Sequence, residues 1–438
     1  MTRLEIINMK KSIIKIMLFF IATVLLVSCD KQPDIDHQFT IAVIPDAQNM
    51  VDFMHQKQEG FPIDAAELFI EQMQFVADNT KSNGGEIEFV TSVGDVWQHL
   101  GIYLDDEHAA RGFPAILFNP RLGIEKINKG INEFELPMAR RGYNLLAYTG
   151  VPFGVAPGNH DYDTGYQYNP FPNDPDPRAR ICEANMVPNR HVGGYNTFND
   201  VFGPDSRYFK GKDWYIDSFN GGVNSAQIFE AGGYQFLHFS FEMQAGDDVL
   251  SWAQNIIDAH PGMPTIMSTH DFLNPRGERM PSPVYDLASV DPLDHNSAED
   301  IWNEWIKKND QIFMILSGHQ IGQAMRVDIN DYGNNVFQIL SDYQGRGMAA
   351  NPVLDGSRIT GIGDGWLRLM EFDTGLDVPI IKVRTYSTHY QRYANEFGDY
   401  VAWYRNMEQP NMSDKEFIEA DHFEIELNDF KKRFGEPN

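Results

Sequence analysis

Several apolar runs in this chain are followed, within a few residues, by a polar side chain that has a lone pair to offer. The residues concerned are Asp46, Asp95, Asn159, His160, Asp161, His270 and His319. The carboxyl ends of strands in an open α/β sheet form the edge where ligands bind. Carboxylates, an amide and imidazoles gathered there would repel one another without a cation, and mixed oxygen and nitrogen ligands suit a divalent metal. The pattern therefore predicts a metal site at this edge.

Each of these residues, taken singly, also has a structural explanation. An aspartate after a strand is a common turn residue, and Gly158-Asn-His-Asp161 is compatible with a tight turn. A buried histidine such as His270 can be satisfied by backbone carbonyls. The metal interpretation depends on finding a polar residue directly after several strands, and not on any one residue.

The order of the motifs resembles the calcineurin-like metallophosphoesterase superfamily, whose pattern runs D-x-H, G-D, G-N-H-[DE], H and G-H-x-H. The matching residues are Gly94-Asp95, Gly158-Asn-His-Asp161, His270 and Gly318-His319, and the resemblance covers roughly residues 38–390. It implies an α/β fold, a four-layer αββα sandwich of two mixed sheets flanked by helices. It also implies metal-dependent hydrolysis of phosphate monoesters or diesters.

Two positions depart from that pattern. The first motif reads Asp46-Ala-Gln48, and the last reads Gly318-His319-Gln320-Ile321, so that each lacks one histidine. In the family the two missing histidines serve the same metal. The resemblance therefore implies one intact site, suited to Zn, Fe or Mn. Its ligands would be Asp95, Asn159, His270 and His319.

The altered site would retain Asp46, Asp95 and the amide oxygen of Gln48. An all-oxygen site that is short of ligands predicts weak binding of a harder ion such as Mn, Mg or Ca. Gln320 and Gln323 are open alternatives for the missing ligands. We expect one tightly bound and one weakly bound metal.

The resemblance also implies catalytic roles. Divalent metals would lower the pKa of a water, and the hydroxide would attack phosphorus in line. Asp95 would bridge the metals, and His160 would protonate the leaving oxygen as general acid. Asp161 or Asp46 would orient His160. Arg346 is a candidate phosphate ligand, although an exposed arginine needs no such role.

Short apolar runs and helical periodicity alternate over the first two-thirds of the chain. The predicted strands are 39–45, 88–93, 152–156, 234–241, 264–268 and 312–316. Helices are expected after Asp64 and Ser297, where capping residues precede an apolar face. Three further strands, at 335–340, 366–372 and 379–386, have no helix between them and predict a β-meander. This order favours two packed sheets with helices outside.

Residues 38–390 are predicted to form one metallophosphoesterase domain. Irregular composition indicates insertions at about 98–145 and 162–232, because connections of that length are rarely plain loops. Residues 391–438 are interpreted as a C-terminal extension with a strand at 422–427.

The N-terminus reads as a targeting segment. Basic residues precede the apolar run 16–27, which is too short to span a bilayer. Leu26-Val-Ser-Cys29 resembles the lipobox of bacterial lipoproteins, which implies that residues 1–28 are a signal peptide and that Cys29 is lipidated. Residues 29–37 would be a tether, and the protein would sit on a membrane of the bacterial envelope, periplasmic or at the cell surface. A cleaved signal with an incidental cysteine is the alternative.

Composition limits the partners. The 438 residues carry a formal charge of −27, and such a surface repels polyanions, which argues against general nucleic-acid binding. A small phosphate ester remains compatible, because a bound metal dominates the local field. Two cysteines exclude a cysteine-rich metal cluster. No protein partner can be inferred.

A second hypothesis is a non-catalytic surface lipoprotein whose degenerate metal site accompanies binding of a glycan or another nutrient. Its basis is the loss of two ligands and a group of aromatic residues in the 162–232 segment. These are Tyr166, Tyr168, Phe171, Tyr195, Phe198, Tyr208 and Trp214. The same aromatics would equally serve to pack that segment against the core.

Overall fold

The computed structural model describes residues 36–437 with gaps at 102–104, 113–114, 117–121, 168–189, 283 and 351–359. Residues 37–438 form one compact unit, so the segment 391–438 belongs to the same body as the rest. Cys29 and the predicted signal peptide lie outside the described residues. No helix within the described part of the chain has the length and apolar character needed to cross a membrane.

The first large sheet is seven-stranded and mixed, with β1 at its centre. Its strands are β1 (Gln38–Ile44), β2 (Ile87–Ser92), β4 (Phe153–Val155), β14 (Trp366–Asp373), β15 (Ile380–Ser387), β16 (Arg392–Tyr393) and β17 (His422–Glu426). Strands β1, β2 and β4 run parallel, whereas β14 pairs antiparallel with β1. The three parallel strands therefore end at one edge.

The second large sheet is also seven-stranded and mixed. Its strands are β7 (Tyr215–Phe219), β8 (Asn224–Ala231), β9 (Tyr234–Ser240), β10 (Thr265–Ser268), β11 (Ile312–Ser317), β12 (Gly322–Ile329) and β13 (Asn335–Asp342). Strands β9, β10, β11 and β13 run parallel to one another. A small third sheet contains β3 (Ala115–Ile116), β5 (Thr164–Gln167) and β6 (Arg190–Gly193).

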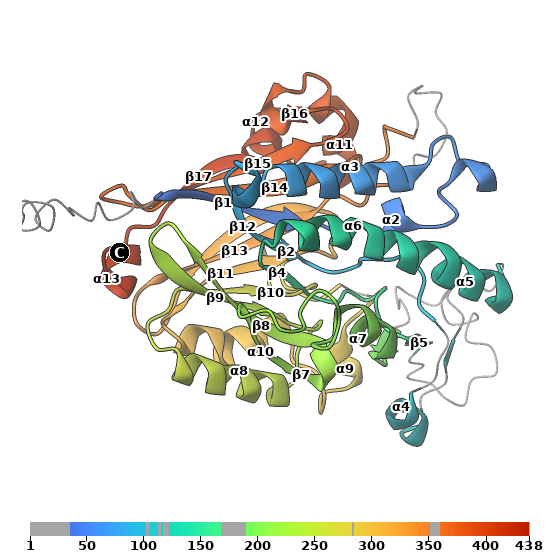
Figure 1. The fold of residues 1–438 in the computed structure, drawn as a ribbon, viewed down its shortest axis with the longest axis horizontal. Coiled ribbons are helices and arrows are strands. Elements are labelled where there is room, and N and C mark those ends of the chain that lie inside the picture. Colours follow the sequence, from blue (N-terminus) through green and yellow to red (C-terminus); the bar gives the residue numbers. More distant parts are fainter. Residues whose placement is uncertain are drawn as a thin grey trace, which may run out of the picture. The chain divides into compact units, whose positions relative to one another are not determined.

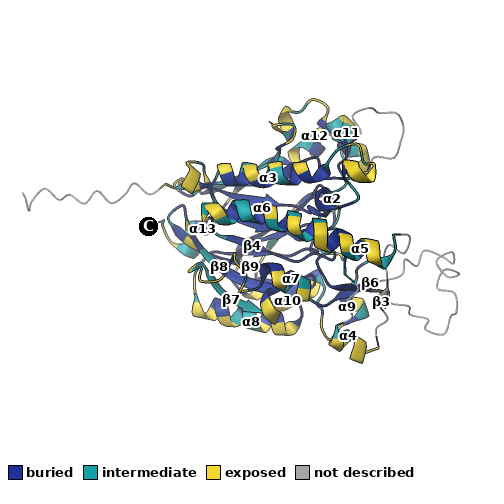
Figure 2. Ribbon diagram, turned by 45° about the vertical axis from the view of Figure 1, so that its right-hand side comes forward, coloured by how far each residue is buried: buried dark blue, intermediate teal, exposed yellow. Residues whose placement is uncertain are grey.

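Helices cover the outer faces of the two large sheets (Figure 1). Helices α3 (Ala65–Asp78) and α6 (Leu136–Thr149) pack in one core cluster with side chains of the first sheet. Helices α8 (Asp247–Ala259) and α10 (Ala298–Glu304) do the same on the second sheet. Figure 2 shows the result: these helices expose one face and bury the other.

The other α-helices and a π-helical turn have nine residues or fewer each. They are α2 (Gln48–Val51), α4 (Asp106–Ala110), α5 (Ile124–Gly130), a π-helical turn (Ile131–Glu135), α7 (Asn196–Phe202), α9 (Leu287–Val290), α11 (Tyr400–Glu408), α12 (Asp414–Glu419) and α13 (Phe430–Phe434). The cap predicted at Ser297 is present at the start of α10, where Ser297 and Asp300 form a capping box. Asp64 precedes α3 but makes no side-chain cap, and its carboxylate accepts the N–H of Lys57 instead.

A third core cluster lies between the two sheets, and strand β1 shows how it forms. Phe39, Ile41 and Val43 join this central cluster, whereas Ala42 and Ile44 point to the helices α3 and α6. Successive side chains of a strand face opposite sides of its sheet, and both sides of β1 are apolar. The four layers are thus helices, sheet, sheet and helices, which confirms the predicted αββα sandwich.

Three predicted boundaries differ from the structure. The supposed 162–232 insertion ends earlier, because Tyr215–Phe219 and Asn224–Ala231 are strands of the second sheet. Residues 335–342 are not part of a meander, since this strand pairs parallel with β11. The C-terminal segment adds the strand 422–426 to the first sheet.

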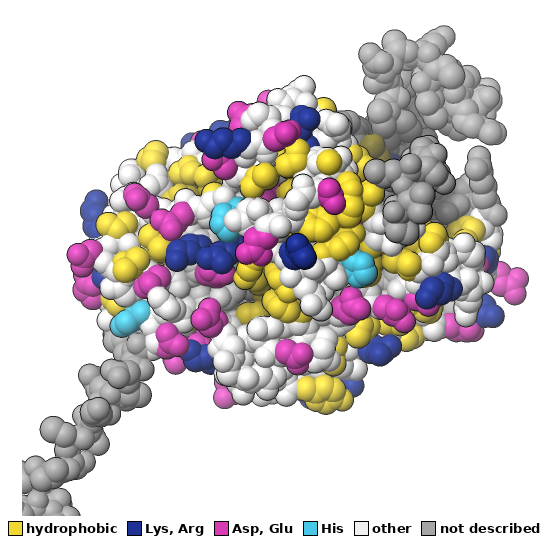
Figure 3. Space-filling view, turned by 90° about the horizontal axis from the view of Figure 1, so that it is seen from above, with side chains coloured by type: hydrophobic (Ala, Val, Ile, Leu, Met, Phe, Trp, Pro, Cys, Tyr) yellow, Lys and Arg dark blue, Asp and Glu magenta, His cyan; other side chains and the backbone are white. Residues whose placement is uncertain are grey.

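Charged side chains of both signs are interspersed on the face seen in Figure 3, without a large field of one sign. The excess of acidic residues in the chain is therefore not concentrated on that face.

Candidate metal centre

The polar residues at the strand ends meet at one edge of the sandwich. The Nε2 atom of His270, after β10, lies 3.0 Å from Oδ1 of Asn159, after β4. The same nitrogen is 3.3 Å from Oδ1 of Asp95, after β2. Nδ1 of His319, after β11, is 3.1 Å from it. The four residues predicted as the intact ligand set therefore share one small volume.

Two glycines of the motifs give these ligands room. A Cβ atom on Gly158 would lie 2.1 Å from Oδ1 of Asp95, and one on Gly318 would lie 2.2 Å from Oδ2 of Asp46. Both separations are far below van der Waals contact, so neither position accepts a larger residue without displacing a carboxylate. The G-N-H-D and G-H motifs thus need glycine for close approach.

The backbone is strained at two of the ligands. Asp95 and His319 both have positive φ angles, 54° and 69°, which non-glycine residues seldom adopt. Such strain persists where the surrounding structure determines the conformation, and it clusters at functional sites. Here it turns both side chains back toward His270.

Hydrogen bonds outside the cluster fix the orientation of His270. Its Nδ1 donates to the carbonyl of Val93 at 2.8 Å, which directs Nε2 to the other ligand atoms. A backbone carbonyl on the second ring nitrogen is the usual support of a metal-binding histidine. Nε2 of His319 is buried and has no hydrogen-bond partner among the described residues.

The charges of the cluster fit a cation. Burial lowers the pKa of His270, but the Asp95 and Asp46 carboxylates outweigh burial and raise that pKa to about 10. Burial and His270 lower the pKa of His319 to about 3, which leaves its ring neutral. Burial raises the pKa of Asp46 well above its ordinary value, with Asp342 adding to the effect. A divalent ion would compensate these carboxylates and displace the proton of His270.

Asp95, His270 and His319 together offer ligand atoms that lie within 4.8 Å of one another, which is close enough to hold a metal ion. The expectation of a metal-capable group at this edge is therefore confirmed in its coarser form. The identity and number of the ions remain predictions.

The altered half of the motif set contains Asp46 and Gln48. Oδ1 of Asp46 accepts the backbone N–H of His319 at 3.1 Å, and Oδ1 also lies 3.8 Å from Nε2 of His270. Gln48 contacts the cluster through its nitrogen, which donates to Oδ2 of Asp95 at 2.9 Å. Ile321, at the place of the second missing histidine, is exposed.

Two residues at this edge were missed in the sequence. Asp342, the last residue of β13, is buried, and Gln344 donates to Asp342 at 2.8 Å and to Asp46 at 3.3 Å. The signal that would have found them is the one used for the other ligands, namely a polar residue at the end of a parallel strand. It was overlooked because the 335–340 run was interpreted as part of a meander.

His160 lies at the rim of the cluster. Its side chain is 25% exposed, and Nε2 is 3.8 Å from Oδ2 of Asp95. Nδ1 donates to the carbonyl of Gln98, so that Nε2 is directed to the open side of the site. The expected orientation of His160 by Asp161 or Asp46 is wrong, because the Gln98 carbonyl does this.

Asp161 has a different role from the one expected. Its carboxylate accepts the N–H groups of Val96 at 2.9 Å, Trp97 at 3.2 Å and Gly158 at 2.8 Å. Burial and the nearby Asp95 raise the pKa of Asp161 to about 8. Asp161 therefore holds the loops after β2 and β4 together.

A buried pair of a histidine and a glutamate supports the segment that carries the Gln98 carbonyl. Nδ1 of His99 lies 2.7 Å from Oε1 of Glu135, and the backbone N–H of His99 donates to Oε2 at 3.0 Å. Burial lowers the pKa of His99, but Glu135 and Asp52 outweigh burial and raise it. Asp52, His99 and Glu135 are close enough to hold an ion. The hydrogen bond of His99 to Glu135 and its 3.9 Å ion pair with Asp52 already explain their arrangement.

The expectation that Arg346 binds phosphate is wrong. Its side chain is fully buried, and its guanidinium makes two hydrogen bonds to Glu408, at 2.7 and 2.9 Å, and one to Asp421 at 3.3 Å. It also lies 4.2 Å from the centre of the Tyr343 ring. Arg346 is a structural cation that joins the loop after β13 to the C-terminal segment.

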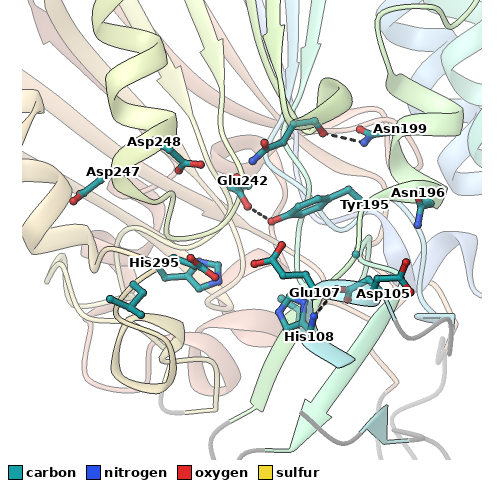
Figure 4. A pocket seen from close by; sticks show the side chains of 16 residues that line it. Asp105, Glu107, His108, Tyr195, Asn196, Asn199, Glu242, Asp247, Asp248 and His295 are labelled. Carbon is teal, nitrogen blue, oxygen red and sulfur yellow. Dashed lines mark hydrogen bonds and ion pairs between the residues drawn. The ribbon is translucent and has the colours of Figure 1, made fainter. Parts of the chain in front are cut away.

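A cavity of about 710 Å³ adjoins the segment after β9 and is seen in Figure 4. Its walls carry many carboxylates, among them Glu107, Glu242 and Asp248, and Tyr195 donates to Glu242. None of the four predicted ligands lines it. Nearby, His108, His191 and Asp291 form another group close enough to hold an ion.

Comparisons with known proteins give no family. No family model matches the chain. A curated relative, the uncharacterized protein YvnB of Bacillus subtilis (strain 168), is 24% identical over 353 residues, covering 79% of this chain and 20% of YvnB. The chain thus spans one fifth of that relative's length. The solved structure titled "GAP50 the anchor in the inner membrane complex of Plasmodium" is similar with a TM-score of 0.35 and 9% identity, covering 81% of this chain and 86% of that chain.

Proposed function

We propose that this protein is a metal-dependent hydrolase of phosphate esters of the calcineurin-like type. The observation that carries the proposal is the meeting of Asp95, Asn159, His270 and His319 around one point, although they come from four different strand ends. Mixed imidazole and oxygen ligands of this kind suit Zn, Fe or Mn. A divalent ion there would neutralise phosphate charge and activate a water for attack.

The protein's own residues would supply the remaining chemistry. His160 presents Nε2 at the open side of the ligand cluster and would donate a proton to the leaving oxygen. The Gln98 carbonyl fixes its tautomer, since Nδ1 must carry a proton to donate to that carbonyl. Asn159 binds Nε2 of His270 through its oxygen, so the residue before the general acid belongs to the ligand set.

The competing hypothesis, binding of a glycan or nutrient by exposed aromatics, has less support. Phe198 and Tyr208 are fully buried in the core cluster beneath α6, and Trp214 packs against the same cluster. The hydroxyl of Tyr195 donates to Glu242. Aromatic rings engaged in this way offer little surface on which a sugar could stack, and Tyr168 and Phe171 of the same group lie outside the described residues. The substrate we propose is a small phosphate ester outside the cytoplasm, met by a lipid-anchored protein of the cell envelope.

A chromogenic assay tests this proposal. The protein is stripped with a chelator, reloaded with Zn or Mn, and incubated with p-nitrophenyl phosphate and with bis(p-nitrophenyl) phosphate. We expect metal-dependent turnover of one of them, abolished by Asp95→Asn and unaffected by Asp205→Asn, at an exposed position. Metal binding without turnover of either substrate would contradict the hydrolase and favour the binding protein.

A further inference from the structure

The loop after β13 reaches the same edge as the candidate ligands. Strand β13 pairs parallel with β11, and Leu340 lies opposite Ser317. Asp342 and His319 each follow this pair by two residues. Asp342 is fully buried, and Gln344 is partly buried. Both side chains point toward Asp46, the first residue of the altered motif set.

Two glutamine amides link three carboxylates at this place. Nε2 of Gln344 donates to Oδ2 of Asp342 at 2.8 Å and to Oδ1 of Asp46 at 3.3 Å. Nε2 of Gln48 donates to Oδ2 of Asp95 at 2.9 Å and to Oε1 of Gln344 at 2.7 Å. Asp46, Asp95 and Asp342 thus surround a pair of neutral amides.

The loop after β13 lies beside the two positions at which the family pattern has histidine. Gln48 occupies one of these positions and donates a hydrogen bond to Gln344 of the loop. Ile321, at the other, lies against the loop, since a Cβ on Gly345 would be 2.9 Å from Cγ2 of Ile321. Gln320 does not compensate, because its nitrogen donates to Asp271 at 2.8 Å and to the carbonyl of Met280 at 2.8 Å. Asp342 and Gln344 are polar groups of the loop that adjoin Asp46.

The charge of the group is not balanced by protein cations. Among the described residues, no lysine or arginine forms an ion pair with Asp46, Asp95 or Asp342, and the imidazoles of His160 and His270 are the basic groups near them. Three buried carboxylates so close together repel one another strongly in a medium of low dielectric. A bound cation would relieve this repulsion.

A buried oxygen atom without a hydrogen-bond partner also indicates a cation at this place. Oε1 of Gln48 is buried and has no hydrogen-bond partner among the described residues. Rotating a side-chain amide by half a turn exchanges its oxygen and nitrogen with little change of shape. A cation beside Asp95 would favour the orientation that presents the oxygen, and carboxylate and amide oxygens are the ligands of hard divalent ions.

We infer that Asp342 and Gln344 replace the missing histidines and build, with Asp46, Asp95 and Gln48, a second cation position made only of oxygen ligands. It takes Mg, Mn or Ca in preference to Zn, beside the imidazole-containing site. This inference rests on the proposed function, because the first cation shares Asp95 with the second. The second cation position goes beyond the proposed function, because it gives the altered site its own residues and its own class of ion.

Sequential metal binding tests the inference. The full chain is stripped with a chelator, loaded with one equivalent of Zn, and titrated with Mn while free Mn is measured by electron paramagnetic resonance. The wild-type protein is expected to bind one Mn, and Asp342→Asn is expected to weaken Mn binding more than tenfold while the Zn content stays at one. Gln344→Ala, at a partly exposed position, is also expected to weaken Mn binding.

Asp373→Asn is the matched control, because Asp373 also ends a strand but pairs with Gln38 at the opposite edge of the first sheet. It should leave both metals unaffected. Wild-type Mn binding by both Asp342→Asn and Gln344→Ala, or no Mn binding by the Zn-loaded wild-type protein, would overturn the second position alone. Failure to bind Zn at a site sensitive to His319→Ala would instead overturn the proposed function.

Discussion

Gly158 touches Asp95 so closely that the missing Cβ atom is part of the site. A methyl group there would stand 2.1 Å from Oδ1 of Asp95, the oxygen that also accepts the backbone N–H of His160 at 2.8 Å. One carboxylate oxygen thus depends on the loop after β4 for both its space and its hydrogen bond.

Replacing Gly158 by alanine should therefore damage metal binding more than folding. We expect Gly158→Ala to lower Zn affinity more than tenfold, because Asp95 must move away from the other ligands. Titration calorimetry with the chelator-treated protein measures this. Gly398→Ala is the control, since a Cβ atom there meets nothing within 4 Å and neither glycine has a positive φ. Equal Zn affinities in the two variants would contradict the close-approach role.

The role of His160 can be separated from that of the metal ligands by varying the leaving group. His160→Ala should keep its metal but lose turnover by roughly 10²–10⁴-fold on alkyl phosphates, whose leaving oxygen needs a proton. The loss should be much smaller with p-nitrophenyl phosphate, because that leaving group is stable as an anion. A uniform loss on both substrates would show that His160 only positions the substrate.

Arg346 is expected to matter for stability rather than for substrate affinity. Arg346→Met leaves Glu408 and Asp421 buried without their cation, which should lower the free energy of unfolding by about 3–5 kcal/mol. Urea unfolding measures the loss, and adding Glu408→Gln should recover part of it. A higher KM for phosphate esters with unchanged stability would restore Arg346 as the candidate phosphate ligand of the sequence analysis.

His238 is the centre of a buried polar chain between the sheets. Its Nδ1 lies 2.8 Å from Oε1 of Gln227, and its Nε2 lies 2.9 Å from Oγ of Ser268, which in turn accepts from Thr91 at 2.8 Å. Burial lowers the pKa of His238 to about 3, from an ordinary value of 6.5. The folded protein therefore holds this ring neutral.

The sign of the resulting pH dependence follows from proton uptake. Between pH 6.5 and about 3 the unfolded chain protonates His238 and the folded chain does not, so acid favours unfolding. In this range we expect the wild-type protein to lose roughly 1.4 kcal/mol per pH unit relative to His238→Gln. Urea unfolding of both proteins at several pH values isolates this contribution from those of the carboxylates. Parallel profiles would mean that His238 is protonated in the folded state.

The parallel strand ends were predictable from sequence because each has a buried apolar run directly before a polar residue. The same rule failed at Asp342, because the residues of β13 alone do not indicate whether the strand runs parallel or antiparallel to its neighbours. The chain passes from β11 to the edge strand β12 and returns antiparallel to it as β13. Strand β13 therefore lies between β12 and β11 in the sheet and runs parallel to β11. Strand β12 was itself missed because Met325, Val327 and Ile329 are exposed on that edge, which hides the usual apolar-in pattern.

Burial of charged residues was the other feature that sequence could not supply. Arg346 looks like any surface arginine until its partners Glu408 and Asp421 are known, and these lie 62 and 75 residues further along the chain. Asp161 presents the same difficulty. Its motif neighbour Asn159 is a candidate metal ligand, but the Asp161 carboxylate accepts hydrogen bonds from the backbone of Val96 and Trp97.

The central position of β1 has a consequence for how the molecule forms. This strand, the first among the described residues, is flanked on one side by β2 and on the other by β14, where Gln38 pairs with Asp373. The sheet that presents Asp46 therefore stays incomplete until more than three hundred residues have been synthesised. High contact order of this kind slows folding, and a chain released early would expose β1 as an unpaired apolar edge that invites aggregation.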